Sequence, residues 1–251
     1  MNPGEIAALI GIGALAGFAN VAAGGGSLLT LPLLLFLGLP STTANATNRI
    51  CLIFQNTSGS IAFYRKQRLP LRLTLRLAAI AIPAALVGAW LAVDVDERTF
   101  RRILGLVMLV VLVPILRQGR TVTRSEPLAS PPHPAWLALS FALIGFYSGF
   151  LQAGVGFPII LALVHLAGLD LVRTNAVKIA TALILQVAAL LVFAATGKVD
   201  WLRGLYLGLG SIIGAWLSAS WQVRQGVVWV RRFLVLAVIL FAIRLLQQGF
   251  S

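Results

Sequence analysis

Continuous apolar stretches, without a strict alternation of apolar and polar residues, dominate this chain of 251 residues. Many of them are about 20 residues long, enough for a helix to cross a hydrocarbon core of ~30 Å. A membrane β-barrel would instead show a period of two along each strand. Because 59% of the residues are hydrophobic and only 11% are charged, the composition also differs from that of soluble domains, which are about one quarter charged. The sequence therefore predicts an all-α integral membrane protein that crosses the bilayer several times.

The apolar runs form two sets, separated by the polar, proline-containing segment "RQGRTVTRSEPLASPPHPA". In each set, a long run is followed by a short run and then by three long runs, which indicates an internal duplication. We therefore divide the chain into a first membrane repeat (1–116), a linker (117–134) and a second membrane repeat (135–251). The runs cover residues 5–22, 27–38, 44–64, 73–92 and 99–116, then 135–152, 157–168, 174–196, 202–220 and 228–247.

The unusual residues of the two sets align with each other. "GALAGF" (13–18) matches "GFYSGF" (145–150), and "AGGG" (23–26) falls on "AGVG" (153–156) with an offset of 130 residues. The same offset places Gly38 on Gly168, Asn45 on Asn175 and Asn48 on Lys178.

Each repeat contains a glycine-rich break followed by a short apolar run. A helix of about 12 residues spans ~18 Å, which is too short to cross the bilayer alone. Short, glycine-interrupted segments at matching positions of two halves indicate a transporter site near the membrane midplane. Irregular backbone at that depth occurs only where it is buried in protein or lines a cavity. We therefore expect the two breaks to build a binding site.

A helix that restarts inside the membrane presents unpaired N–H groups and the positive end of its dipole. We expect Ser27 to cap the first short helix, which would leave the amides of Gly24, Gly25 and Gly26 to face an anion. Gln152, Gly154 and Gly156 are the candidates in the second break. The alternative is that the glycines only let helices approach closely. We favour that alternative for the pairs Gly13/Gly17 and Gly145/Gly149, and the binding site for the triplet.

Polar residues open the long helix that follows each short run. Arg49 and Lys178 are candidate cations at membrane depth, although snorkelling to a headgroup stays open for both. "FQNTSGS" (54–60) either lines the cavity or bonds across helices, and we favour the cavity. The candidate site residues of these helices are Asn45, Thr47, Asn48, Arg49, Gln55 and Asn56 in the first repeat, and Asn175, Lys178, Thr181 and Gln186 in the second.

The acidic residues argue against a cation site. All seven lie at expected helix ends or in loops: Glu5, Asp94, Asp96, Glu97, Glu126, Asp170 and Asp200. A cation transporter or proton pump usually has a carboxylate in mid-span. A lone histidine such as His165 is more often packed than proton-carrying. We therefore disfavour both classes.

The remaining chemical signals point away from enzymes, cofactors and nucleic acid. A single cysteine excludes an internal disulfide, and no Cys/His cluster has metal-ligand spacing, so we expect no metal and no cofactor. "GIGALAG" follows no strand, and "GGGSLL" lacks the lysine of a P-loop. An enzyme would need acid–base or metal residues within the bilayer. The net charge of +13 comes mostly from short loops, where membrane topology and lipid headgroups account for it.

The segments "AAGGGSLLTLPLLLFLGLP" and "TTANATN", with "AGVGFPI" and "RTNAVK" as their counterparts, resemble the TauE/SafE family of sulfite exporters. The resemblance covers essentially the whole chain. It implies export or uptake of sulfite, sulfonates or related sulfur-containing anions. The second copy departs from the first, since Val155 stands where the first break has Gly25.

We therefore expect a secondary transporter of a small sulfur-containing anion in the lipid bilayer. A passive anion channel and a non-transporting membrane partner of a sulfur or redox enzyme are the alternatives, and a homodimer stays open.

The Lys/Arg distribution places the loop 65–76 and the linker 117–134 on the cytoplasmic side of the inner membrane. If each short helix joins the broken span as one crossing element, we expect inverted repeats. Re-entrant hairpins would make the repeats parallel. We favour the inverted arrangement.

Overall fold

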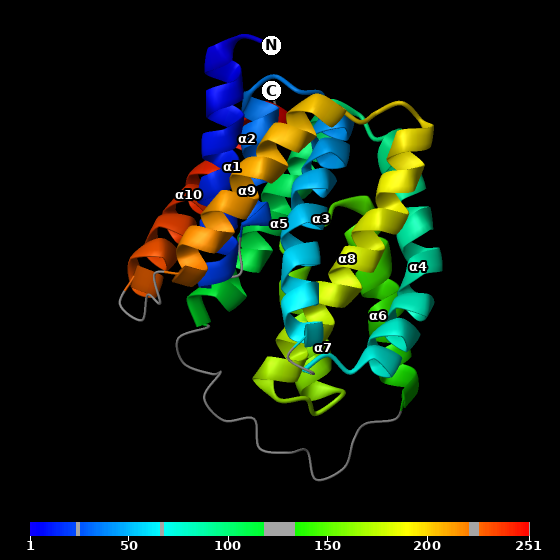
Figure 1. Ribbon diagram of the computed structural model, residues 1–251. Helices are drawn as coiled ribbons and strands as arrows, with labels where there is room; N and C mark the ends of the chain where they lie inside the picture. The colour runs from blue at the N-terminus through cyan, green and yellow to red at the C-terminus, as the bar shows by residue number, and fades with distance from the viewer. Residues whose placement is uncertain (24–25, 66–67, 118–133, 221–225, 251) are drawn as a thin grey trace.

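The computed structural model describes residues 1–23, 26–65, 68–117, 134–220 and 226–250, and every regular element in these ranges is an α-helix. The predicted runs all become helices, with boundaries that differ by at most three residues. The helices form one elongated bundle (Figure 1). They are α1 (Pro3–Ala23), α2 (Ser27–Phe36), α3 (Ser41–Arg65), α4 (Leu71–Val93), α5 (Glu97–Arg117), α6 (Pro134–Phe150), α7 (Gly156–His165), α8 (Leu171–Ala195), α9 (Trp201–Ser220) and α10 (Gly226–Phe250).

Several helices have the length and composition of membrane spans. Within the described residues, four stretches are long and apolar enough to cross a bilayer: Pro3–Asn20, Leu71–Val93, Leu171–Ala195 and Arg232–Phe250. Large apolar side chains point outward from the bundle, for example Trp90 and Leu191, which are 63% and 66% exposed. Such an apolar exterior suits lipid. The prediction of an all-α membrane protein is confirmed.

Small residues bring α1 against α9 and α6 against α4. A methyl group added at Gly13 would collide with the carbonyl oxygen of Leu207, and one added at Gly149 would collide with that of Ala85. Gly17 and Gly145 meet backbone in the same way. These glycines therefore allow close helix contact, as predicted from their spacing.

The two short helices turn back along the helices that precede them. Gly26, at the start of α2, packs against Ala16 and Asn20 of α1, which a continuous helix could not bring together. Between α6 and α7 the chain reverses through Gln152 and Gly154, both with positive φ. Each pair is therefore a re-entrant hairpin (Figure 1). The expectation of one crossing element per pair is wrong, because the breaks reverse the chain.

Helices that correspond under the predicted repeat run in opposite directions. In α3 and α8, Arg49 lies beside Gln186, whereas the later residue Gly59 lies beside the earlier residue Ile179. The pair α5 and α10 is antiparallel in the same way. A hairpin returns the chain to the end of the bundle at which it began, so three further helices lead each half to the opposite end, as an inverted arrangement requires. The link that we drew between hairpins and parallel halves is therefore wrong, and the duplication itself stays a prediction.

Candidate functional site

The two breaks meet inside the bundle. The backbone N–H of Gly154 donates a hydrogen bond to Oγ of Ser27 over 3.2 Å. From this contact α2 and α7 lead toward opposite ends of the molecule (Figure 1). The N-terminal ends of two short helices from different halves therefore converge. The convergence joins residues that lie 127 positions apart.

The start of α2 differs from the prediction in one detail. Gly26 occupies the N-cap position, and no side chain caps the helix. The hydroxyl of Ser27 accepts from Gly154 of the other half, so the expectation that Ser27 caps its own helix is wrong. Gly24 and Gly25 lie outside the described residues.

Lys178 of α8 lies beside the start of α7. Its Cδ is 3.4 Å from the position that a Cβ of Gly156 would occupy. Its ammonium group donates to Oδ1 of Asn175 over 3.0 Å, and the side chain is half-buried. Among the described residues, no carboxylate forms an ion pair with Lys178. The convergence therefore combines two positive helix ends with one ammonium group.

Arg49 of α3 is fully buried and does not snorkel. Its Nη1 donates to the carbonyl oxygen of Ser148 over 3.0 Å and to Oε1 of Gln186 over 2.9 Å, and its Nη2 donates to the carbonyl oxygen of Gly149. The guanidinium carbon lies 4.9 Å from the ring centroid of Phe193. The carbonyl groups belong to the end of α6, so Arg49 connects α3, α6 and α8.

Asn45 completes the contact between α3 and the end of α6. Its Nδ2 donates to the carbonyl oxygen of Phe150 over 2.8 Å. Nε2 of Gln152 donates to the backbone carbonyl of Asn45 over 3.4 Å. The break after α6 is thus held by side chains of α3.

Unpaired polar atoms surround these contacts. Buried donors and acceptors without a hydrogen bond cost about 1–3 kcal/mol each, so each calls for an explanation. Among the described residues, the buried atoms without a partner in this region are Asn45 Oδ1, Asn48 Oδ1 and Nδ2, Arg49 Nε, Ser148 Oγ, Gln152 Oε1, Thr181 Oγ1 and Gln186 Nε2.

Ser148 was not among the predicted site residues. It lies in "GFYSGF", between Gly145 and Gly149, whose spacing indicated helix packing only. The signal that could have found it is a hydroxyl group one turn before a predicted break. Only the fold shows that this hydroxyl lies next to the Arg49 contacts.

Other predicted site residues have structural partners. Oγ1 of Thr47 accepts from the backbone N–H of Asp200 over 3.1 Å, next to the start of α9. Oε1 of Gln55 accepts from Nδ2 of Asn20 over 2.8 Å, so Gln55 bonds across to α1. Thr57 and Ser58 are exposed, and their place in a cavity lining stays a prediction. Asn56 is half-buried.

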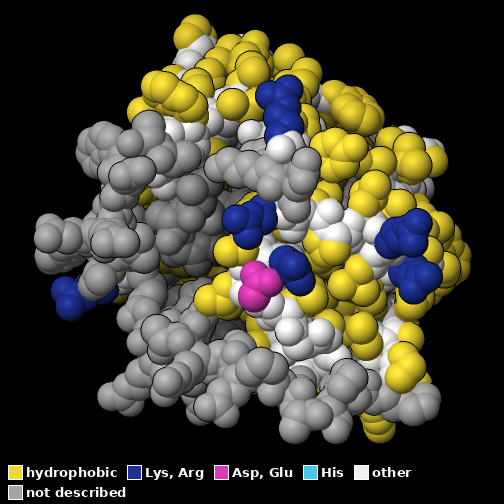
Figure 2. Space-filling view, turned by 60° about the horizontal axis from the view of Figure 1, so that its bottom comes forward, with side chains coloured by type: hydrophobic (Ala, Val, Ile, Leu, Met, Phe, Trp, Pro, Cys, Tyr) yellow, Lys and Arg dark blue, Asp and Glu magenta, His cyan; other side chains and the backbone are white. Residues whose placement is uncertain are grey.

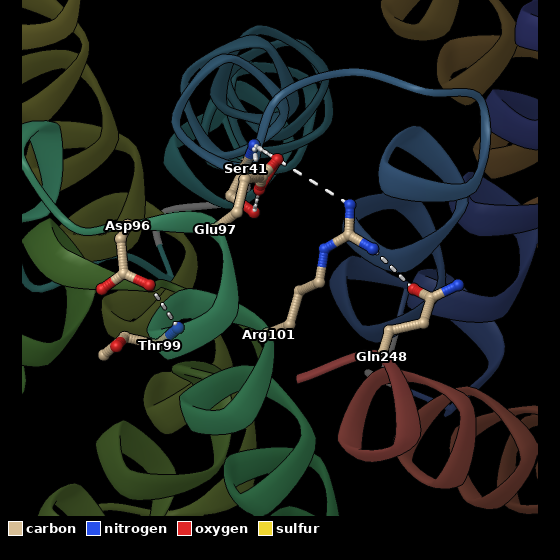
Figure 3. A network of polar contacts seen from close by, with 6 residues as sticks. All are labelled: Ser41, Asp96, Glu97, Thr99, Arg101 and Gln248. Atoms are coloured by element: carbon tan, nitrogen blue, oxygen red, sulfur yellow. Dashed lines mark hydrogen bonds and ion pairs between the residues drawn. The ribbon is translucent and has the colours of Figure 1, made fainter. Parts of the chain in front are cut away.

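A second polar network fixes the start of α3, the helix that carries Asn45, Asn48 and Arg49. The backbone N–H of Ser41 donates to Oε1 of Glu97 over 2.8 Å, and the Ser41 hydroxyl also donates to this carboxylate. Arg101 pairs with Glu97 over 3.8 Å and donates to Oε1 of Gln248 over 2.6 Å (Figure 3). The network ties α3 to α5 and α10.

Comparison with known proteins gives a consistent result. Proteins of three bacteria, each named as a probable membrane transporter protein, are similar to the chain over most of its length. "Probable membrane transporter protein ORF9" of Sinorhizobium sp is 29% identical over 93% of this chain and 89% of its own. A probable membrane transporter protein of Haemophilus influenzae is 28% identical (92% and 90%), and YfcA of Escherichia coli K12 is 27% identical (99% and 92%). No solved structure matches the chain.

The sequence profile of the family described as "Sulfite exporter TauE/SafE" matches residues 9–245, almost the whole chain. The match spans both hairpins and every helix between them. Neither the family nor the named relatives are described as enzymes. The chain belongs to the TauE/SafE family and is a membrane transporter.

Proposed function

We propose that the protein transports a small sulfur-containing anion, such as sulfite or an organosulfonate, bound where the two hairpins meet. The observation that carries the proposal is the convergence of the α2 and α7 N-termini, joined by the hydrogen bond from Gly154 to Ser27. Two positive helix ends that approach each other repel, and an anion between them removes the repulsion. The family description, which names sulfite export, supports the choice of a sulfur oxyanion.

The chemistry of the surroundings suits a sulfonate or sulfite group. Its oxygens accept several hydrogen bonds at once, and the convergence offers backbone N–H groups and the Lys178 ammonium group. The described candidate ligands at the convergence are Gly26, Ser27, Gly154, Gly156, Asn175 and Lys178. Gly24 and Gly25 remain part of the proposal from the sequence alone. Asn45, Asn48, Gln152, Thr181 and Gln186 supply unpaired polar atoms deeper between α3, α6 and α8.

The test uses the purified protein in two assays. A thermal-shift series with sulfite, methanesulfonate, thiosulfate, sulfate and acetate measures binding, because a ligand that binds only the folded state raises its stability. We expect sulfite or methanesulfonate to raise the melting temperature, and acetate to leave it unchanged. Uptake of the stabilising anion into proteoliposomes, against protein-free liposomes, then measures transport. No stabilisation by any sulfur anion would reject the proposed substrate class.

The same assay separates the alternatives. A carrier gives saturable flux that depends on an ion or pH gradient. A passive channel gives flux that ignores such gradients. A protein that serves only as a membrane partner of an enzyme gives no flux although it is folded.

We also propose that the molecule lies in the inner membrane with the α3–α4 end in the cytoplasm. Arg65, Arg68, Arg72 and Arg76 are exposed at this end. Figure 2 looks onto the same end and shows Lys and Arg side chains there with few acidic ones. An excess of Lys and Arg in short loops marks the cytoplasmic side. The linker 118–133, which we expect on this side too, lies outside the described residues.

A further inference from the structure

Resting on the proposed function, we infer that the two interior cations have different tasks. Lys178 binds the transported anion. Arg49 is a positioning residue that holds the end of α6 inside the membrane and thereby sets the place of the second break. The sequence suggests the same task for both, because each is a cation near a predicted break.

The end of a helix inside a bilayer needs hydrogen-bond donors from other elements. The last four carbonyl groups of a helix have no partner within the helix, and inside a bilayer no bulk water replaces them. At the end of α6, Arg49 binds the carbonyl groups of Ser148 and Gly149, and Asn45 binds that of Phe150. A cation at a helix C-terminus also interacts favourably with the negative end of the dipole. Arg49 thus meets the requirements of this particular helix end.

Arg49 has few N–H donors left for a ligand. A guanidinium group carries five N–H donors. Three of them have protein acceptors, namely the two carbonyl groups and Oε1 of Gln186, and the ring of Phe193 lies against the guanidinium carbon. Two N–H donors are left, one on Nη2 and the one on Nε, and Nε is buried without a partner. The planar group is therefore fixed by protein on several sides, as a positioning residue requires.

Lys178 has the opposite surroundings. Its hydrogen-bond partner among the described residues is the neutral amide oxygen of Asn175, and no described carboxylate pairs with it. Its stem lies against Gly156, at the positive end of α7. A cation in this place is unfavourable unless an anion is present. The transported anion is the group that this arrangement lacks.

The first experiment compares KM, Vmax and ligand-free melting temperature for methanesulfonate uptake in proteoliposomes. We expect Lys178→Met to raise KM about tenfold or more, since it loses a charge-assisted hydrogen bond, and to leave the ligand-free melting temperature nearly unchanged. We expect Arg49→Gln to lower the melting temperature and the yield of folded protein, while KM of the folded fraction stays close to that of the wild type. Arg98→Gln, at an exposed position, is the control.

Milder variants keep the test decisive if Arg49→Gln does not fold. Arg49→Lys keeps the charge but cannot bridge two carbonyl groups in the same way. Asn45→Ala, which removes the neighbouring bond to Phe150, should also lower the melting temperature. Arg49→Lys should do so without raising KM. A raised KM at an unchanged melting temperature in either Arg49 variant would show that Arg49 binds the substrate and would overturn the inference.

Chemical rescue tests Lys178 directly. In a Cys51→Ala background, Lys178→Cys is treated with 2-aminoethyl methanethiosulfonate, whose thiosulfonate sulfur forms a disulfide with the cysteine thiolate and releases methanesulfinate. After removal of the reagent, the attached ammonium group should restore a low KM. Methyl methanethiosulfonate, which adds a neutral group, should not. Equal effects of the two reagents would exclude a role for the charge.

The outcome also distinguishes this inference from the proposed function. If the wild-type protein neither binds nor transports methanesulfonate or sulfite, the proposed function and the task of Lys178 fail together. The task of Arg49 is then decided by melting temperature alone. An unchanged melting temperature in Arg49→Gln would reject it.

Discussion

At the scale of single residues, the same amino acid has different tasks in one helix. Gly11 and Gly13 are two positions apart in α1. A Cβ at Gly11 would meet nothing within 4 Å, whereas one at Gly13 would collide with the backbone of Leu207 in α9. The neighbouring helix, and not the local sequence, decides which glycine is required.

We predict that Gly13→Ala destabilises the protein and that Gly11→Ala does not. Overpacking costs about 1–3 kcal/mol, and the value should reach the upper end because the obstacle is backbone. At Gly11 the change should be neutral or stabilising by up to about 1 kcal/mol, since alanine is the better helix former. Melting temperatures in the same detergent give the comparison. Equal effects of the two variants would contradict the packing described here.

A second prediction concerns Asp170, which caps α8 outside the membrane-spanning segment. Its Oδ1 accepts from the backbone N–H groups of Val172 and Arg173, each over 3.0 Å. The bond from Arg173 is the first cause that lowers the pKa of Asp170 below its ordinary value. Asp170→Ala should cost about 1 kcal/mol at neutral pH, and Asp170→Asn, which keeps an acceptor, should cost less.

The pH dependence of this cap has a definite sign. A carboxyl group whose pKa is lowered by folding stabilises the folded state above its unfolded pKa of about 3.9. The contribution disappears as the pH falls through the lower pKa of the folded state. The difference in melting temperature between wild type and Asp170→Ala should therefore shrink below about pH 4. A difference that grows on acidification would contradict this role.

At the scale of elements, the break between α6 and α7 depends on backbone conformation. Gly154 has φ +71°, and a Cβ there would lie 2.9 Å from Cγ1 of Val111. A Cβ added at Gly156 would lie 3.4 Å from Cδ of Lys178, its nearest neighbour, which is an ordinary van der Waals contact. The break therefore requires glycine at position 154, whereas position 156 has room for a Cβ.

We predict that Gly154→Ala lowers the amount of folded transporter and that Gly156→Ala leaves it unchanged. A left-handed conformation costs a residue with a Cβ about 1–2 kcal/mol, and the contact with Val111 adds to this. Size-exclusion chromatography and the melting temperature measure the folded fraction. If Gly156→Ala proved the more harmful variant, the geometry of the break would be different from the one described.

At the scale of the whole molecule, charge differs between the two ends of the bundle. The exposed arginines between α3 and α4 lie at one end. Among the residues that the structure describes, Asp170 is the acidic residue at this end. The other end carries the remaining described acids, near the starts of α1, α5 and α9 and the end of α4: Glu5, Asp94, Asp96, Glu97 and Asp200. The arginines at the α3–α4 end support the proposed orientation, since the positive-inside bias counts Lys and Arg and acidic residues add little to it.

Cysteine labelling tests the orientation. Cys51 is buried and is the one cysteine of the chain, so Cys51→Ala gives a background without thiols. We expect Lys198→Cys to react with a membrane-impermeant maleimide in intact cells, and Arg72→Cys to react only after permeabilisation. Both positions are exposed. The reverse pattern would place the α3–α4 end outside.

Much of the architecture could be predicted from short stretches of sequence. Apolar length gave the ten helices within the described residues, and the glycines around Gly26 and Gly154 marked both reversals. The reversal itself was misjudged, because a broken crossing helix and a hairpin have the same local pattern. The contact of Gly26 with Ala16 and the positive φ of Gln152 and Gly154 distinguish them. The burial of Arg49 was likewise undecided, since a cation near a helix end can snorkel or be enclosed.

The sequence by itself determined that the protein lies in lipid and where its helices run. It also determined that no described helix carries a carboxylate in mid-span. Each of these properties follows from side chains that are close together in the chain. Tertiary structure decided which polar atoms have partners. The bond from Arg49 to Gly149 spans 100 residues, and the one from Gly154 to Ser27 spans 127. Contacts of this range depend on how hairpins from both halves pack. No local pattern of hydrophobicity or helix propensity contains that information.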